Sequence, residues 1–111
     1  MKFLSRSEEF VLLAVWKLQE RAYSLPIREK ISDITGQDWS LGSIYTPLER
    51  LSRKGLLTSY LTEATAERGG RHKRVYQLTP SGRQALIQIR TIEQAMWSGV
   101  TGLALEGGSR E

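Results

Sequence analysis

The sequence contains no cysteine, one histidine and three prolines among its 111 residues. Without cysteine the chain can form neither disulfide bonds nor thiolate zinc sites, and it has no thiol nucleophile. The same absence fits a reduced, intracellular setting, so we expect a cytoplasmic protein. A single histidine leaves little material for metal ligation or for a catalytic triad.

The sequence also lacks a long hydrophobic run. Its longest apolar stretch, Phe10 to Trp16, is far short of the ~20 residues that a membrane-spanning helix needs. The stretch MKFLSRSEEF becomes charged within a few residues, which is untypical of a signal peptide. A chain of 111 residues is the size of one ordinary domain. We therefore expect one folded domain and no membrane segment.

Positive charge exceeds negative charge only modestly, with 16 Lys and Arg against 12 Asp and Glu. The placement of the charge says more than the total. The stretch ERGGRHKRVYQLTPSG places four basic residues around a Gly-Gly pair and then turns apolar. Those residues are Arg68, Arg71, Lys73 and Arg74. Such a cluster on a protruding turn is typical of a surface that contacts nucleic-acid phosphates.

The first predicted helix spans about 6 to 21. Ser5 and Glu8 form an S-x-x-E capping box at its start. Apolar positions, which include Phe10 and Leu13, go most of the way round this helix. A helix without a clean polar face is usually buried on two sides. In a domain this small, we expect a second subunit to supply the second side.

A second helix is predicted over 24 to 36, with Pro26 in its first turn and Gly36 as its C-terminal cap. Its inward stripe follows the helical period and consists of Ile27, Ile31 and Ile34. A break at GQDW separates this helix from the next one.

A third helix is predicted between Ser40 as N-cap and Gly55 as its C-terminal stop. Its inward face consists of Leu41, Ile44, Leu48 and Leu51. Pro47 removes a backbone donor and clashes with the preceding turn, so either the helix kinks there or it starts later than Ser40. The candidates for DNA contact are the outward residues Ser43, Tyr45, Thr46 and Arg50.

The hydrophobic period then changes. LLTSYLTE and RVYQLT, on either side of the Gly-Gly region, predict a β-hairpin that must lie against the helices to be stable. Thr79 and Pro80 start a last helix over 80 to 98. Its apolar seam is suited to pairing with another helix and consists of Ala85, Leu86, Ile89, Ile92, Met96 and Trp97. Packing within the chain is the alternative for this seam.

The predicted fold is mainly α, in the α+β class. Three helices and a two-stranded wing form a winged helix-turn-helix, and a C-terminal helix provides dimerisation. We expect residues 1–79 to be the DNA-binding domain, 80–98 the dimerisation helix and 99–111 a flexible tail. The hairpin would then be a short arm that carries its basic cluster to a phosphate backbone.

Each candidate has a simpler alternative. The wing cluster of Arg68, Arg71, Lys73 and Arg74 could be only a solvated turn, and Tyr45 could pack into the core. Arg50 and Arg53 could simply pair with Glu49 or with other acids on the surface. His72 on the turn is either a neutral bystander or a functional residue, as a titrating switch or as a groove or phosphate contact. Hydroxyls and Tyr bond phosphate oxygens, while Arg can read guanine edges bidentately, and these features leave the division between phosphate and base contacts open.

The sequence also resembles the PadR-like transcriptional regulators. The resemblance covers roughly residues 8 to 90 and is carried by LGSIYTPLERLSRKGLL followed by ERGGRHKRVYQLTPSGRQAL. Val75 and Tyr76 stand where that family usually has two adjacent aromatics, and Pro47 stands where a small residue is common. The resemblance implies a homodimeric winged helix of the short form that binds a palindromic operator, usually as a repressor.

Three functions compete on this basis. The leading hypothesis is a dimeric DNA-binding regulator, and the runner-up is a winged helix that contacts only other proteins. An enzyme is disfavoured, since the sequence has no phosphate loop and no metal-ligand spacing. We assign no cofactor and no metal. The partners we expect are double-stranded DNA, a second copy of the chain and, between Trp16 and Trp97 at the dimer interface, a small-molecule effector.

Overall fold

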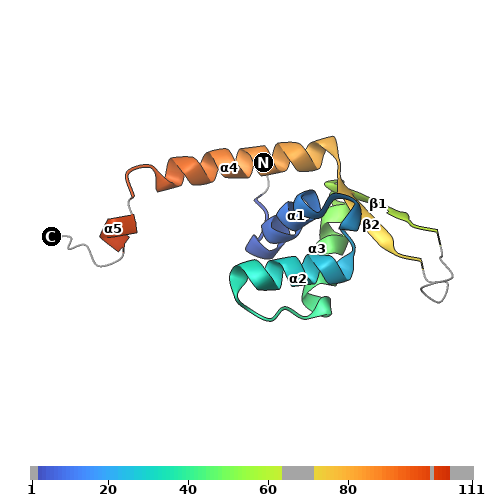
Figure 1. The fold of residues 1–111 in the computed structure, drawn as a ribbon. Helices are drawn as coiled ribbons and strands as arrows, with labels where there is room; N and C mark the ends of the chain where they lie inside the picture. Colours follow the sequence, from blue (N-terminus) through green and yellow to red (C-terminus); the bar gives the residue numbers. More distant parts are fainter. Residues whose placement is uncertain (1–2, 64–71, 101, 106–111) are drawn as a thin grey trace.

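The computed structural model describes residues 3–63, 72–100 and 102–105. Figure 1 shows three helices packed together, a hairpin at one end and a long helix that runs past them. The elements in chain order are α1 (Arg6–Leu18), the 3-10 turn η1 (Gln19–Arg21), α2 (Ser24–Thr35), α3 (Leu41–Arg53), β1 (Leu57–Leu61), β2 (Arg74–Leu78), α4 (Pro80–Trp97) and α5 (Gly102–Leu105). The predicted winged-helix arrangement is confirmed. None of the helices among the described residues is long and apolar enough to cross a membrane.

The capping box at the start of α1 is present. The Glu8 N–H donates to Ser5 Oγ at 3.2 Å, and the Ser5 N–H donates to Glu8 Oε1 at 2.8 Å. The helix ends at Leu18 rather than at 21, and the last predicted turn is η1. Gln19 makes that change of path with φ 53° and ψ −121°.

The core lies where α1, α2 and α3 meet above the base of the hairpin. Apolar side chains from all three helices and from β1 form one buried cluster, because each helix directs one stripe inward. Its largest members are Leu12, Ile27, Ile44, Leu48 and Leu51.

Two predicted core positions are wrong. Ile34 is 65% exposed and Leu41 is 38% exposed. Ile34 lies in the last turn of α2, where the chain leaves for α3 and no described element covers it. Leu41 is the first residue of α3, and helical side chains point back toward the N-terminus, so its side chain extends past the end of the helix.

Pro47 lies inside α3 and is buried. The helix nevertheless begins where predicted, with the Ser43 N–H donating to Ser40 Oγ at 3.1 Å, so a later start is excluded. Because proline has no N–H, the Ser43 carbonyl has no intrahelical donor four residues on.

The hairpin pairs β1 and β2 antiparallel, with Leu57 opposite Leu78 and Leu61 opposite Arg74. It is joined to the helices by main-chain bonds, because the Tyr76 N–H donates to the Ala22 carbonyl at 2.9 Å. The chain after α1 thus lies along the edge of β2. This contact gives the two-stranded sheet the support that an isolated hairpin lacks.

The start of α4 is fastened to the base of the hairpin. Thr79 caps α4, since its Oγ1 accepts from the Gly82 N–H at 3.0 Å. The same residue bonds the turn before β1 through its N–H to the Leu56 carbonyl at 3.1 Å and its hydroxyl to the Gly55 carbonyl at 2.7 Å. Past this point α4 runs alongside α1 and then beyond the helical bundle (Figure 1). The four-residue helix α5 lies in the stretch that was expected to be a tail.

Candidate nucleic-acid interface

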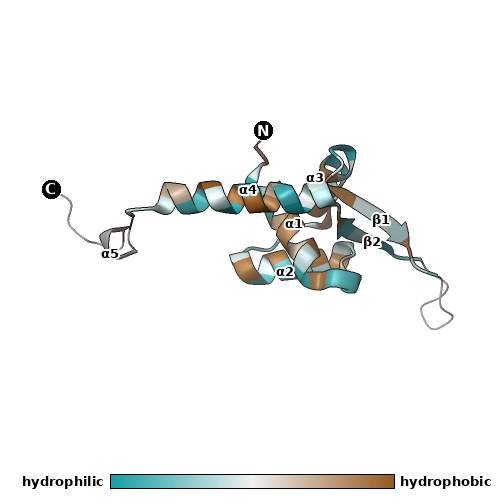
Figure 2. Cartoon of the chain, turned by 90° about the horizontal axis from the view of Figure 1, so that it is seen from above, coloured by the Kyte–Doolittle hydropathy of each residue, from teal (hydrophilic) through white to brown (hydrophobic). Residues whose placement is uncertain are grey.

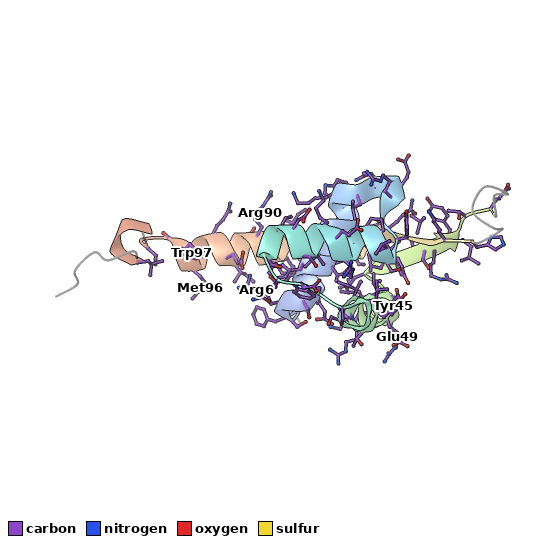
Figure 3. The ribbon with its side chains drawn as sticks, turned by 60° about the horizontal axis from the view of Figure 1, so that its bottom comes forward. Arg6, Tyr45, Glu49, Arg90, Met96 and Trp97 are labelled. Carbon is purple, nitrogen blue, oxygen red and sulfur yellow. The ribbon has the colours of Figure 1, made fainter. Side chains whose placement is uncertain are left out.

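The outer face of α3 carries the predicted DNA-contact residues. Ser43, Tyr45, Thr46 and Arg50 are all exposed, and Tyr45 has 52% of its surface in solvent. Figure 3 shows Tyr45 and Glu49 on the outer side of this helix. The inward residues Ile44, Leu48 and Leu51 hold the helix in place from below. The face therefore offers hydroxyls, a phenol and a guanidinium from one rigid element.

Local contacts leave much of this face free. Ser43 Oγ lies 2.8 Å from Ser40 Oγ, at the N-terminal end of α3. Glu49 pairs with Arg53 at 3.4 Å rather than with Arg50, and both partners are over 70% exposed. Among the ion pairs between described residues, none includes Arg50. The guanidinium of Arg50 is thus available to a ligand on this face.

The two described basic residues of the wing differ in their surroundings. Arg74 is exposed and donates to Ser59 Oγ across the hairpin at 3.0 Å. Lys73 is half-buried, with Nζ 4.3 Å from the centre of the Tyr23 ring and 3.1 Å from its hydroxyl. Lys73 therefore fastens the hairpin to the loop before α2, and Arg74 is the cation that faces solvent.

Of the other residues predicted for the wing, the structure describes only His72. Arg68 and Arg71 lie outside the described residues, so the structure places neither. His72 is exposed and bonds the Thr62 carbonyl through Nδ1, which holds it beside the end of β1. Burial raises the pKa of the Tyr76 phenol, which lies half-buried against the core, while the nearby Arg74 acts in the opposite direction.

Sequence reasoning missed Trp39, the residue before the α3 N-cap. Its indole Nε1 donates to Thr35 Oγ1 at 3.1 Å, and its N–H donates to Ser32 Oγ at 3.1 Å. Its carbonyl accepts from Arg28 Nη1 at 3.1 Å. Three bonds to α2 therefore determine where α3 begins. The signal in the sequence was a large apolar residue immediately before an N-cap serine, a common staple position.

A groove of about 550 Å³ lies between α1 and α4, on a different part of the molecule. We call it the α1–α4 groove. Its apolar walls include Leu13 and Trp16, which are 44% and 48% exposed in the single chain, on the helix whose second side we expect another subunit to cover. A charged rim includes Arg6, which bonds Glu93 at 2.9 Å. The groove is lined by Arg6, Glu9, Phe10, Leu13, Trp16, Leu78, Arg83, Leu86, Ile87, Ile89, Arg90 and Glu93.

The predicted seam of α4 divides into two halves. Ala85 and Leu86 are half-buried, and Ile89 is buried within its own chain. Further along, Ile92, Met96 and Trp97 are 37%, 75% and 56% exposed. Figure 3 shows Met96 and Trp97 on the part of α4 beyond the helical bundle, and Figure 2 shows apolar positions continuing into that part. The second half of α4 thus carries apolar side chains with no cover from the described residues.

The described residues contain no group of side chains that could bind a metal ion. In residues 3–63, 72–100 and 102–105, no three His, Asp or Glu side chains gather as metal ligands do. Glu8, the buried carboxylate among the residues that the structure describes, has a structural role. Burial alone would raise its pKa, but the Ser5 N–H and the Lys54 ammonium at 2.9 Å outweigh burial and hold the pKa below its ordinary value.

Known protein structures share this geometry. RosR of H. salinarum superposes with a TM-score of 0.69 at 21% identity, over 90% of this chain and 83% of that one. The smu.1704 protein of Streptococcus mutans superposes with a TM-score of 0.67 at 23% identity, over 100% of this chain and 99% of that one. A PadR-like transcription factor from Bacteroides fragilis superposes with a TM-score of 0.68 at 23% identity, over 86% of this chain and 89% of that one.

At these identities the structural neighbours bear on the fold alone. No curated protein matches the sequence significantly. The model of the transcriptional regulator PadR-like family matches residues 12–88, which is more than half of the chain and includes α3 and the described part of the wing. This protein therefore belongs to the PadR-like family of DNA-binding transcriptional regulators.

Proposed function

We propose that this protein is a homodimeric repressor that binds a palindromic operator. The observation that carries the proposal is the exposed face of α3, where Ser43, Tyr45, Thr46 and Arg50 project from a helix held in place by buried leucine and isoleucine side chains. Hydroxyls and Tyr suit phosphate oxygens, and Arg suits a guanine edge. In this proposal residues 1–79 bind DNA and 80–98 hold the dimer together.

The wing supports the same proposal through its exposed cation. Arg74 is an exposed cation on β2, and Arg68 and Arg71 lie close to it in the sequence. Each phosphate that such a residue neutralises releases condensed counterions, so affinity falls as salt rises. Lys73 contributes chiefly by holding the hairpin against Tyr23.

The dimer proposal rests on two uncovered apolar surfaces. The α1–α4 groove lies beside the first half of α4, the second half of α4 carries exposed apolar side chains, and the described residues cover neither surface. A twofold axis would place the Met96 and Trp97 region of one copy over the groove of the other. Two recognition helices would then meet half-sites about 34 Å apart.

Selection of bound duplexes from a random pool tests the DNA proposal. The enriched sequence should be palindromic, and binding should weaken steeply between low and high salt. A transcription reporter that carries the enriched sequence at its promoter should fall in output when the protein is present. Rising output would make the protein an activator. Enrichment of no sequence would favour the alternative, a winged helix that contacts only proteins.

An effector site is a second candidate function, favoured by the aromatic lining of the groove. Trp16 lies in the groove with the Arg83 guanidinium carbon 5.4 Å from the centre of its ring. An aromatic anion would find both a stacking surface and a cation there. Titration with such compounds should quench tryptophan emission and change operator affinity together. Quenching without a change in affinity would show binding that has no regulatory role.

A further inference from the structure

The first turns of α1 contact both ends of the recognition helix α3. At one end, Glu8 is 3% exposed and accepts from Lys54 Nζ at 2.9 Å, and Lys54 is the C-cap of α3. At the other end, the Phe10 ring meets the Trp39 ring edge-on, with centroids 6.2 Å apart and planes at 66°. Trp39 directly precedes Ser40, the N-cap of α3.

The same turns of α1 also form a wall of the α1–α4 groove. Phe10 lines the groove and touches Trp39 behind it, so its ring separates the groove from the turn before α3. Arg6 reaches across the groove to Glu93 of α4 at 2.9 Å, and its guanidinium carbon lies 5.9 Å from the centre of the Phe10 ring. Whatever fills the groove would therefore contact Phe10.

Trp39 has little freedom to absorb such a displacement. Its N–H, carbonyl and indole N–H are all bonded to α2 side chains, from Ser32, Arg28 and Thr35. Phe10 and Trp39 are both partly buried and pack against the core, so neither ring can move into the core without displacing close-packed side chains. A shift of the Phe10 ring would therefore be passed to the α2–α3 turn, and through it to the Ser40 and Ser43 end of α3.

We propose that the Phe10–Trp39 contact couples occupancy of the α1–α4 groove to the seating of α3 on DNA. Trp39 is then a positioning residue, since it acts through α3 rather than by touching DNA. The inference rests on the proposed function, with the second copy of the chain as the occupant of the groove. Coupling between two sites of one protein typically changes affinity about 5- to 150-fold.

A double-mutant cycle on half-site DNA tests the coupling. A duplex with a single half-site contacts one subunit, so it removes the tethering that a full palindrome would impose. The groove is vacated by Leu13→Asn with Ile87→Asn, which are neutral changes at side chains 44% and 47% exposed on its opposite walls. Sedimentation verifies the vacancy through loss of self-association, and thermal unfolding verifies the fold.

The groove changes should lower half-site affinity about fivefold when Phe10 is present and less than twofold in the Phe10→Leu background. Trp39→Phe serves as a second background if Phe10→Leu does not fold. An equal loss in both backgrounds, or no loss with Phe10 present, overturns the coupling while leaving the DNA-binding proposal intact. A wild-type protein that binds no selected duplex overturns both.

Discussion

At the scale of single residues, Glu8 is the most consequential polar group in the described chain. It is a buried carboxylate that receives the Ser5 N–H at 2.8 Å and the Lys54 ammonium at 2.9 Å. Lys54 keeps about a third of its side chain in water, with 36% exposed, so screening weakens its share. The main-chain bond inside the cap is the better-protected part.

Glu8→Gln should lower the free energy of unfolding at neutral pH by about 1.5–3 kcal/mol, the range for a hydrogen bond to a charged group. Because the folded-state pKa is lowered, the stabilisation is present above the ordinary value of 4.5 and is lost as pH falls through the folded pKa. Denaturant unfolding from pH 3 to 7 should therefore show a smaller acid loss in the variant than in the wild type.

Glu9→Gln is the matched control for that experiment. Burial raises the pKa of Glu9, and Glu93 raises it further although Arg6 opposes both. The contribution of Glu9 is thus largest at low pH and falls as pH rises through the raised pKa. Glu9→Gln should keep or increase stability at neutral pH. A loss of stability equal to that of Glu8→Gln would show that negative charge in the first turn of α1, rather than the capping bond of Glu8, provides the stabilisation.

Gln19 stores backbone strain at the end of α1. Its φ of 53° with ψ of −121° is a conformation that glycine adopts more easily than residues with a Cβ. Gln19→Gly should raise the free energy of unfolding by about 1 kcal/mol, since relief of about 1–3 kcal/mol of strain exceeds the entropic cost of glycine. Gln19→Ala, which keeps the strain and loses the Nε2 bond to the Trp16 carbonyl, should not stabilise.

At the scale of elements, the backbone is closely packed at the junction between the hairpin and α4. A Cβ added at Gly82 would lie 2.2 Å from the Leu56 carbonyl oxygen, which already accepts from Thr79. Gly82→Ala should therefore lower the free energy of unfolding by about 2–3 kcal/mol, because overpacking forces the backbone apart. Gly42→Ala on α3 is the control, since its Cβ would meet only Ser40 Oγ at 3.9 Å.

Substitutions of the two neighbouring basic residues of the wing, Arg74 and Lys73, should have different effects. Arg74→Ala should reduce the slope of log affinity against log salt by about 1 on a half-site duplex, because one phosphate contact is lost. Lys73→Ala should chiefly lower the free energy of unfolding, by about 0.5–1 kcal/mol, through loss of its contact with Tyr23. Equal salt slopes for both variants and the wild type would exclude the described wing from phosphate contact.

Local rules were enough to predict most of this fold. The caps at Ser5, Ser40 and Thr79 depend on neighbours three residues away, and they are where the sequence pattern predicts them. Helical period does not say where the covering element stops, and so Ile34 was predicted to be inside. The sequence also does not show which basic residue of the wing packs against the domain, since Tyr23, the partner of Lys73, is 50 residues away in the sequence.

The candidate site could be predicted only in part for the same reason. The outward positions of α3 follow from its period once the inward face is known, and all four are exposed. For Trp39 the sequence offered only its place before an N-cap serine, because its importance comes from bonds to three side chains of α2 and from contact with a ring of α1. The dimer and the DNA contacts stay predictions that self-association and duplex-binding measurements will decide.

At the scale of the whole molecule, the chain is elongated. Its extents are 64 × 29 × 20 Å, and its radius of gyration is 17.0 Å, against about 13 Å for a compact chain of some 100 residues. The long axis follows α4, whose second half lies beyond the bundle (Figure 1). A projecting helix with apolar side chains is typical of a chain that associates with another.

Self-association should therefore depend on that projecting half. Trp97→Asn should weaken dimer formation at least tenfold in sedimentation, because burial of a large apolar side chain contributes about 1.5–3 kcal/mol. The wild-type melting temperature should also rise with protein concentration. Leu25→Asn is the matched control, since Leu25 is 44% exposed but lies on α2. Weakening by both variants would argue against a specific contact through α4.

The uninterrupted course of α4 from Pro80 to Trp97 has a geometric consequence. One residue added to a helix advances the remainder of that helix by about 1.5 Å and turns it by about 100°. In the proposed dimer, the length of α4 would therefore set both the separation of the two subunits and their rotation relative to each other. Adding or deleting about one whole helical turn would adapt the dimer to operators with a different half-site spacing. A single added residue would instead rotate the apolar stripe of α4 out of contact with the partner subunit.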